Sequence, residues 1–219
     1  MAENYLITGY WGEPHVTAEN DRGIHAAIFG AGRFVLPVGE QFRAEYIGNN
    51  TIRMYDGKLL DNGAAAGIPA GEYIDLVVSG AGQGMKRNDL IVFQYEKDET
   101  STVETGKFVV VKGTETSGVA ADPELTQADL LSGAAIFDQM ALWRVPISAT
   151  TISAPEQLFS VRDSIQSAKD TANAAQSTAT TALTTANETK GKLAGCWISF
   201  TDEDGNPTDE PYIHWEQEV

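Results

Sequence analysis

The 219-residue chain contains a single cysteine, Cys196, which excludes an internal disulfide and a cysteine-rich zinc site. Long apolar runs are also missing, since no stretch approaches the roughly 20 residues that span a bilayer. The first residues, MAENYLITGYWGEPH, have no basic region followed by an apolar run, so we expect no secretion signal. These features favour assembly in a reducing cytoplasm and argue against membrane insertion.

Basic residues are scarce. The chain has 15 Lys and Arg against 31 Asp and Glu, which gives a net charge of −16. A surface this acidic repels the phosphates of nucleic acids, so we expect no nucleic-acid partner. It also argues against binding to anionic membrane surfaces. Hydrophobic residues make up 42% of the chain, which is enough for a globular core.

Residues 1–153 are predicted to form a mainly β, sandwich-like domain. Apolar and polar residues alternate over 42–46 and again over 52–54, on either side of Gly48-Asn49-Asn50, which is typical of a hairpin. One short helix is expected after Asp122-Pro123. Further strands are predicted at Tyr73–Val78, Leu90–Tyr95, Phe108–Val111 and Ala141–Val145, with an exposed hairpin loop at Glu96–Gly106.

Residues 154–194 carry the clearest period in the chain. Ser153 and Glu156 form a capping box, and a seven-residue spacing of apolar residues follows from Leu158. This spacing predicts a long α-helical coiled-coil stalk; the alternatives are a long helix on its own domain and a flexible Ala/Thr linker. The predicted oligomerisation residues are Leu158, Val161, Ile165, Ala168, Ala172, Ala175, Ala179, Ala182, Ala186 and Leu193.

Residues 195–219 are predicted to form a small C-terminal β-hairpin, because two apolar stretches flank a loop rich in Asp, Gly and Pro. Asp202, Asp204 and Asn206 stand at positions 1, 3 and 5 of an EF-hand-like loop and are a calcium candidate. Pro207 replaces the glycine of such loops, and Ile213 stands where the glutamate belongs. A solvated acidic turn is the alternative.

No constellation for catalysis emerges from the sequence. None of His15, His25 and His214 has a partner at helical metal-ligand spacing, and the motif G-x-S-x-G does not occur. The glycines of 30–32 and 80–84 lack the lysine of a phosphate-binding loop. We therefore expect no enzyme, no catalytic residues and no cofactor. The aromatics Tyr10, Trp11 and Trp215 suit sugar stacking but are more typical of a β core.

Several stretches of the chain resemble one family. Residues 15–21 (HVTAEND), 26–30 (AAIFG), 84–92 (GMKRNDLIV), 109–114 (VVVKGT) and 204–211 (DGNPTDEP) are similar to distal-tail or baseplate structural proteins. These belong to phages and prophages of Gram-positive, Clostridia-like bacteria. The resemblance implies a β-rich attachment domain, a trimeric helical stalk and a distal module, as in lactococcal-type upper baseplate proteins. It implies no catalytic residues.

The resemblance implies a virion protein of a phage tail, baseplate or tail fibre that oligomerises and docks on the tail. Its expected partners are further copies of itself, as a homotrimer, and other tail or baseplate proteins. Its expected location is the virion tail, with assembly in the host cytoplasm. The alternative is a receptor- or carbohydrate-binding protein of the phage tip that attaches to a host cell-surface glycan. Residues 1–153 are predicted to be the docking end.

Overall fold

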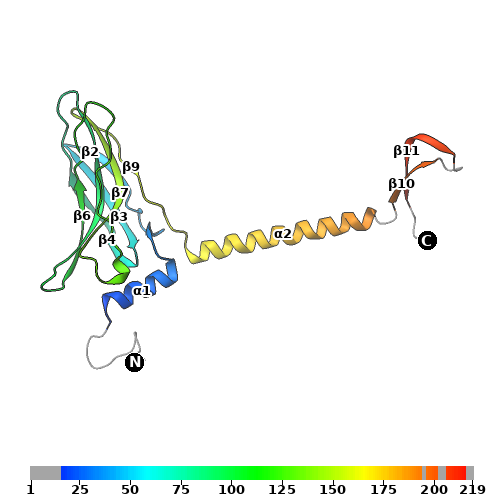
Figure 1. Ribbon diagram of the computed structural model, residues 1–219, viewed down its shortest axis with the longest axis horizontal. Coiled ribbons are helices and arrows are strands. Elements are labelled where there is room, and N and C mark those ends of the chain that lie inside the picture. The colour runs from blue at the N-terminus through cyan, green and yellow to red at the C-terminus, as the bar shows by residue number, and fades with distance from the viewer. Residues whose placement is uncertain (1–15, 194–195, 202–205, 216–219) are drawn as a thin grey trace. The chain divides into compact units, whose positions relative to one another are not determined.

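The computed structural model describes residues 16–193, 196–201 and 206–215. The chain divides into two compact units, Met1–Ser164 and Ile165–Val219 (Figure 1). The first unit is built from nine strands in two antiparallel sheets, with one α-helix and one 3₁₀ turn among its described residues. Among the described helices, none combines the length and apolar character needed to cross a membrane.

Sheet A is organised around one long strand. Strands β1 and β2 pair with opposite ends of the same edge of β3, and β4 pairs along its other edge. Asn49 and Asn50 both adopt positive φ at the turn into β3, which suits a tight hairpin and confirms the hairpin predicted there. The strands are β1 (Arg33–Val35), β2 (Ala44–Gly48), β3 (Thr51–Asp61) and β4 (Ala64–Val77).

Sheet B has β5 and β7 at its centre, with β6 on the far side of β5 and two short strands on β7. Strands β5 and β6 pair from Leu90 with Val111 to Lys97 with Glu104, so the connecting loop is shorter than the predicted Glu96–Gly106. The strands are β5 (Lys86–Lys97), β6 (Glu104–Val111), β7 (Phe137–Ser148), β8 (Thr151–Ile152) and β9 (Glu156–Gln157).

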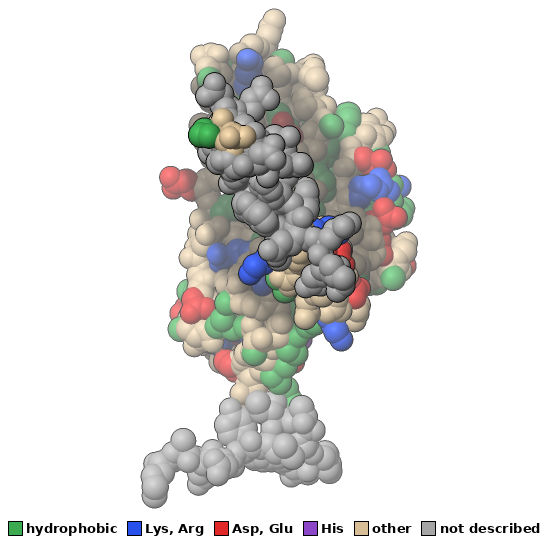
Figure 2. Space-filling model, turned by 90° about the vertical axis from the view of Figure 1, so that its right-hand side faces the viewer, with side chains coloured by type: hydrophobic (Ala, Val, Ile, Leu, Met, Phe, Trp, Pro, Cys, Tyr) green, Lys and Arg blue, Asp and Glu red, His purple; other side chains and the backbone are tan. Residues whose placement is uncertain are grey.

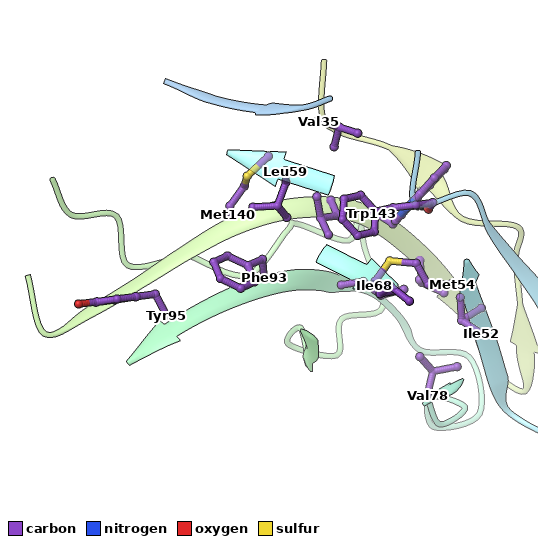
Figure 3. Close-up of a cluster of buried hydrophobic side chains, with 14 of the residues drawn as sticks. Val35, Ile52, Met54, Leu59, Ile68, Val78, Phe93, Tyr95, Met140 and Trp143 are labelled. Atoms are coloured by element: carbon purple, nitrogen blue, oxygen red, sulfur yellow. Dashed lines mark hydrogen bonds between the residues drawn. The ribbon is translucent and has the colours of Figure 1, made fainter. Parts of the chain in front are cut away.

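Both sheets turn apolar side chains toward one shared core. Figure 3 shows side chains of β3 and β4 facing those of β5 and β7. Trp143 lies within this core and donates its indole N–H to the carbonyl oxygen of Phe42, at 2.9 Å. The polar end of a large aromatic is thereby satisfied, as a buried position requires. The labelled core residues are Val35, Ile52, Met54, Leu59, Ile68, Val78, Phe93, Tyr95, Met140 and Trp143.

Helix α1 (Ala18–Phe29) was not predicted from the sequence. Thr17 caps it by accepting a hydrogen bond from the Asn20 amide, at 3.2 Å, and Gly30 ends it with a φ of 87°. The helix expected after Asp122 is only a 3₁₀ turn, η1 (Leu130–Ser132). Asp122 instead accepts hydrogen bonds from Asn88 and Arg144, so its side chain holds a loop on sheet B.

Residues 158–162, which we call the strap, run from β9 back across β1. The Leu158 amide donates to the carbonyl oxygen of Leu142, at 3.0 Å. The Val35 amide donates to Ser160, at 2.9 Å, and the Arg162 amide donates to Val35, at 2.8 Å. The strap is therefore hydrogen-bonded to both sheets of the first unit.

Charges of both signs are mixed on the surface of the first unit, and Figure 2 shows acidic and basic side chains interspersed on the face that it presents. Several of them are paired across strands, such as Lys107 with Glu96, at 2.8 Å. An isolated exposed pair of this kind contributes about 0–1 kcal/mol.

The second unit contains α2 (Ile165–Leu193) and an antiparallel pair of strands, β10 (Cys196–Thr201) and β11 (Pro207–Trp215). The two strands agree with the predicted C-terminal hairpin. The first unit is mainly β, which is compatible with the predicted sandwich-like domain.

The predicted trimeric coiled-coil stalk is wrong. Helix α2 has 29 residues and begins at Ile165, not at the capping box of Ser153 and Glu156. Glu156 lies in β9, and both Leu158 and Val161 lie in the strap, so the first two positions of the predicted seam are not helical. Tertiary packing overrides the local pattern here, because Phe159 packs edge-on against Trp143 with ring centroids 5.5 Å apart.

Threonines of α2 satisfy their own hydroxyl groups within the helix. Five Thr hydroxyls donate to the carbonyl oxygen four residues earlier, at 2.9–3.1 Å. Side chains from Ile165 to Lys192 are all exposed, including Leu183 at 63%. The apolar stripe that predicted a stalk is therefore a face of short, exposed side chains on α2.

Candidate functional site

The outward face of sheet A carries an exposed array of aromatic and charged side chains. Residues of β3 and β4 alternate between the core and this face, so the inward pair of buried Met54 and partly buried Ile74 is followed by the outward pair of Tyr55 and Tyr73. We call the array the tyrosine face, and it consists of Arg43, Glu45, Arg53, Tyr55, Tyr73, Asp75 and Val77.

Two tyrosine rings form the centre of this face. Tyr55 and Tyr73 are direct cross-strand partners, with ring centroids 6.3 Å apart and planes tilted by 59°. The Arg43 guanidinium lies over the Tyr55 ring, 3.9 Å from its centroid. The Arg53 guanidinium lies over the Tyr73 ring, at 3.7 Å. Each ring is thus held by a cation–π contact as well as by its strand neighbours.

Carboxylates fix both guanidinium groups in place. Arg53 donates two hydrogen bonds to Asp75, at 2.8 and 2.9 Å, in a two-point fork. Arg43 contacts Glu45, at 3.2 Å, and Glu45 also accepts the Tyr55 hydroxyl at 2.5 Å. The face is therefore ordered before any partner arrives, which lowers the entropy that binding has to overcome.

These contacts favour the ionised form of both carboxylates. The hydrogen bonds from Arg53 hold the pKa of Asp75 below its usual value. The Tyr55 hydroxyl, and then the Arg43 charge, lower the pKa of Glu45 in the same direction. At the rim, Val77 is 74% exposed and Tyr73 is 48% exposed, so apolar surface lies beside the paired charges.

A second feature is a pocket of about 420 Å³ between α1, the start of β4 and the edge strand β6. Its walls are small residues of 63–67 and the aromatic rings of Phe93, Tyr95 and Phe108. Arg22 lies buried at its base, where it donates to the carbonyl oxygen of Leu130, at 3.1 Å, and pairs with Glu104. The Arg22 charge is already matched by Glu104, so Arg22 does not offer a free cation to a ligand in this pocket.

The predicted oligomerisation residues belong to two different elements. Leu158 and Val161 belong to the strap, while the positions from Ile165 to Ala186 lie exposed on α2 and Leu193 is its last residue. Of the calcium candidate, Asp202 and Asp204 lie outside the described residues, and Asn206 is exposed.

The other candidates are scattered. His25 lies on α1 with its Nδ1 atom 2.9 Å from the carbonyl oxygen of Gly63. His15, Tyr10 and Trp11 lie outside the described residues. In residues 16–193, 196–201 and 206–215, no group of three or more His, Cys, Asp or Glu is placed to hold a metal ion.

Sequence reasoning missed the tyrosine face. The alternation Arg53, Tyr55 and the alternation Tyr73, Asp75, Val77 are both visible in the sequence, and each places its members on one face of a strand. Only the register of β3 with β4 brings Arg53 opposite Asp75, and a one-residue slip would separate them.

The scan against protein-family models and the searches of curated proteins and of solved structures found no match.

Proposed function

We propose that this protein is a structural component of a bacteriophage tail, baseplate or tail fibre, and that the tyrosine face of the first unit docks on another tail protein. The observation that carries the docking proposal is the exposed, pre-ordered array of two tyrosines and two arginines on sheet A. Tyrosine and arginine are enriched at the centres of protein interfaces, where they dominate the binding energy. The assignment to a phage tail is supported by the sequence resemblance over residues 15–114.

The charges of the face indicate what the partner surface carries. Within the face, Glu45 and Asp75 balance the two guanidinium groups, and Glu40, which pairs with Arg43 beside the face, adds one excess negative charge. We therefore expect the partner surface to carry hydrogen-bond donors or a basic group opposite the rim, because these complement the negative charge. The exposed Val77 beside Tyr73 would then be covered by apolar surface of the partner.

The test is binding of the full-length chain to isolated tail particles of the phage or prophage that carries it. Tyr73→Ala removes a central ring, and a residue of this kind at an interface centre is worth about 2 kcal/mol, or roughly 30-fold in affinity. Ile136→Ala is the matched control, because Ile136 is 50% exposed and lies outside the tyrosine face. Equal binding of both variants and the parent chain would reject the docking surface.

Two further measurements test the assignment itself. Electron microscopy of tail particles carrying a labelled chain should place it at the tail, and absence of the chain from the particle would contradict the proposal. Binding of the purified chain to a host glycan, lost in Tyr73→Ala, would favour the carbohydrate-binding alternative instead.

The homotrimer belongs to the same proposal and does not depend on a stalk. Light scattering of the full-length chain should give about three times its mass of 23.5 kDa. A mass equal to one chain would exclude it.

A further inference from the structure

Three charged side chains meet where sheets A and B face each other. Arg33 of β1 donates from Nε to Asp61 of β3, at 2.9 Å, and from Nη2 to Asp138 of β7, at 2.6 Å. The side chains of both aspartates are completely buried. One guanidinium therefore links two carboxyl groups that belong to different sheets.

The same junction holds a loop in place. The amide of Ala128 donates to Oδ1 of Asp138, at 2.5 Å, and its carbonyl oxygen accepts from Arg33, at 3.0 Å. The side-chain amide of Asn62 donates to Oδ1 of Asp61, at 3.4 Å. Every one of these contacts uses the Oδ1 atom of a carboxyl group or the Arg33 guanidinium.

The second oxygen of each carboxyl group has no such donor. Oδ2 of Asp61 and Oδ2 of Asp138 are fully buried and accept no hydrogen bond from the described residues. Both carboxyl groups contact the same guanidinium, Asp61 at Nε and Asp138 at Nη2, so they are neighbours around Arg33. Two carboxylates have no proton to donate, and with one arginine between them they would leave a buried excess negative charge. One proton between the two groups resolves both the missing donor and the excess charge.

We propose that Asp61 and Asp138 share one proton at neutral pH, and that loss of this proton in mildly alkaline solution loosens the junction between the two sheets. A cation is a poorer occupant of the site than a proton. Two carboxylates are fewer ligands than metal ions take, and Arg33 already places a positive charge there.

The electrostatics of the site support this proposal. Burial, followed by the neighbouring Asp138, raises the pKa of Asp61 to about 8, although Arg33 acts in the opposite direction. The charged groups that face Asp61 are Arg33 from β1 and Asp138 from β7, while the packed loop contributes only the backbone of Ala128. From α1, Arg22 is occupied by Glu104 and Leu130, and His25 contacts Gly63.

The sign of the effect follows from the raised pKa. An unfolded aspartate titrates near 3.9, so protonation of Asp61 favours the folded state. The contribution of Asp61 to stability is complete below about pH 4, falls as the pH rises, and is lost above about pH 8. Between these limits, the equilibrium constant for unfolding rises by up to about tenfold per pH unit.

The test is urea unfolding of the full-length chain at several pH values between 5 and 9. Asp138→Asn replaces the shared proton with a permanent amide donor and keeps an oxygen for Arg33 and Ala128. The ratio of the unfolding constants of the parent and this variant should therefore rise roughly 100-fold between pH 5 and pH 7. Asp61→Asn should give the same change, and it serves as the second variant if the first does not fold.

Asp56→Asn is the matched control. Asp56 is a buried aspartate on the same strand that accepts amides of Glu40 and Gly71, both at 3.2 Å. This variant should keep the pH dependence of the parent chain, and so should His25→Asn. A ratio that stays within about twofold for both aspartate variants would overturn the proposal. Equal effects of Asp56→Asn or His25→Asn would also overturn it, as would a stabilisation by Ca²⁺ or Mg²⁺ that both aspartate variants lose.

Discussion

Arg87 offers the most direct test of how the first unit is held together. Its side chain is fully buried on β5 and donates two hydrogen bonds to Asp89, at 2.8 and 3.2 Å. It also donates to the carbonyl oxygen of Gly80, at 2.9 Å, to Glu115, at 2.9 Å, and to Ser79. One guanidinium thus fastens two loops to sheet B.

Arg87→Met removes that guanidinium and leaves the Asp89 carboxylate buried, where the Gly113 amide, at 3.0 Å, is its one remaining donor among the residues that the structure describes. Breaking a buried ion pair from one side costs about 3–5 kcal/mol, because the remaining charge is not compensated. The matched variant is Arg144→Met. Arg144 and Asp122 are each about a third exposed, at 32% and 31%, so we expect a loss of about 1 kcal/mol.

The assay is urea unfolding of the full-length chain, followed by tryptophan fluorescence, since Trp143 reports on the core. The double variant Arg87→Met with Asp89→Leu should recover most of the loss, because it removes the buried charge as well. The reasoning fails if Arg87→Met costs no more than Arg144→Met, or if the double variant is no more stable than Arg87→Met alone.

Three further predictions follow from the packing. A fragment of residues 1–153 lacks β9 and the strap, so its thermal unfolding midpoint, measured by circular dichroism, should lie below that of a fragment of residues 1–164. Equal midpoints would mean that the Phe159–Trp143 contact adds no stability. Gly113→Ala places a Cβ atom 2.0 Å from the Asn88 carbonyl oxygen, so it should lower the free energy of unfolding, measured with urea, by more than about 2 kcal/mol. Gly118→Ala should change this free energy little. Ile165→Asp and Ala172→Asp should leave the mass measured by light scattering unchanged, because both residues are exposed on α2; a fall in mass would restore the discarded seam.

Local patterns predicted part of the fold. The hairpin around Asn49 and Asn50 follows from residues that tolerate positive φ between two alternating stretches, and the structure confirms it. The pairing of β5 with β6 was predicted from two apolar stretches that flank a polar one. Helix α1 was missed because it includes Gly23 and has only a weak apolar stripe, so nothing but its caps marks it in the sequence.

The error at residues 153–164 has an identifiable cause. A capping box and a seven-residue spacing are local signals, and both are present there. The strap instead gains backbone hydrogen bonds to Leu142 and Val35, together with the contact between Phe159 and Trp143, and these partners lie far away in sequence. The tyrosine face and the Asp61–Asp138 junction depend on strand register and on the facing of two sheets, which no local pattern encodes.

The strap also has a mechanical consequence. A pulling force that enters the first unit from residue 165 reaches the strap before either sheet, and its first backbone contact is that of Arg162 with Val35. Peeling the strap breaks its hydrogen bonds one after another, whereas the long pairing of β5 with β7 would have to yield over many residues at once. Releasing its five residues would lengthen the chain by about 17 Å while the core stays closed. Under such a force the strap would therefore be released and extend before either sheet of the first unit separates.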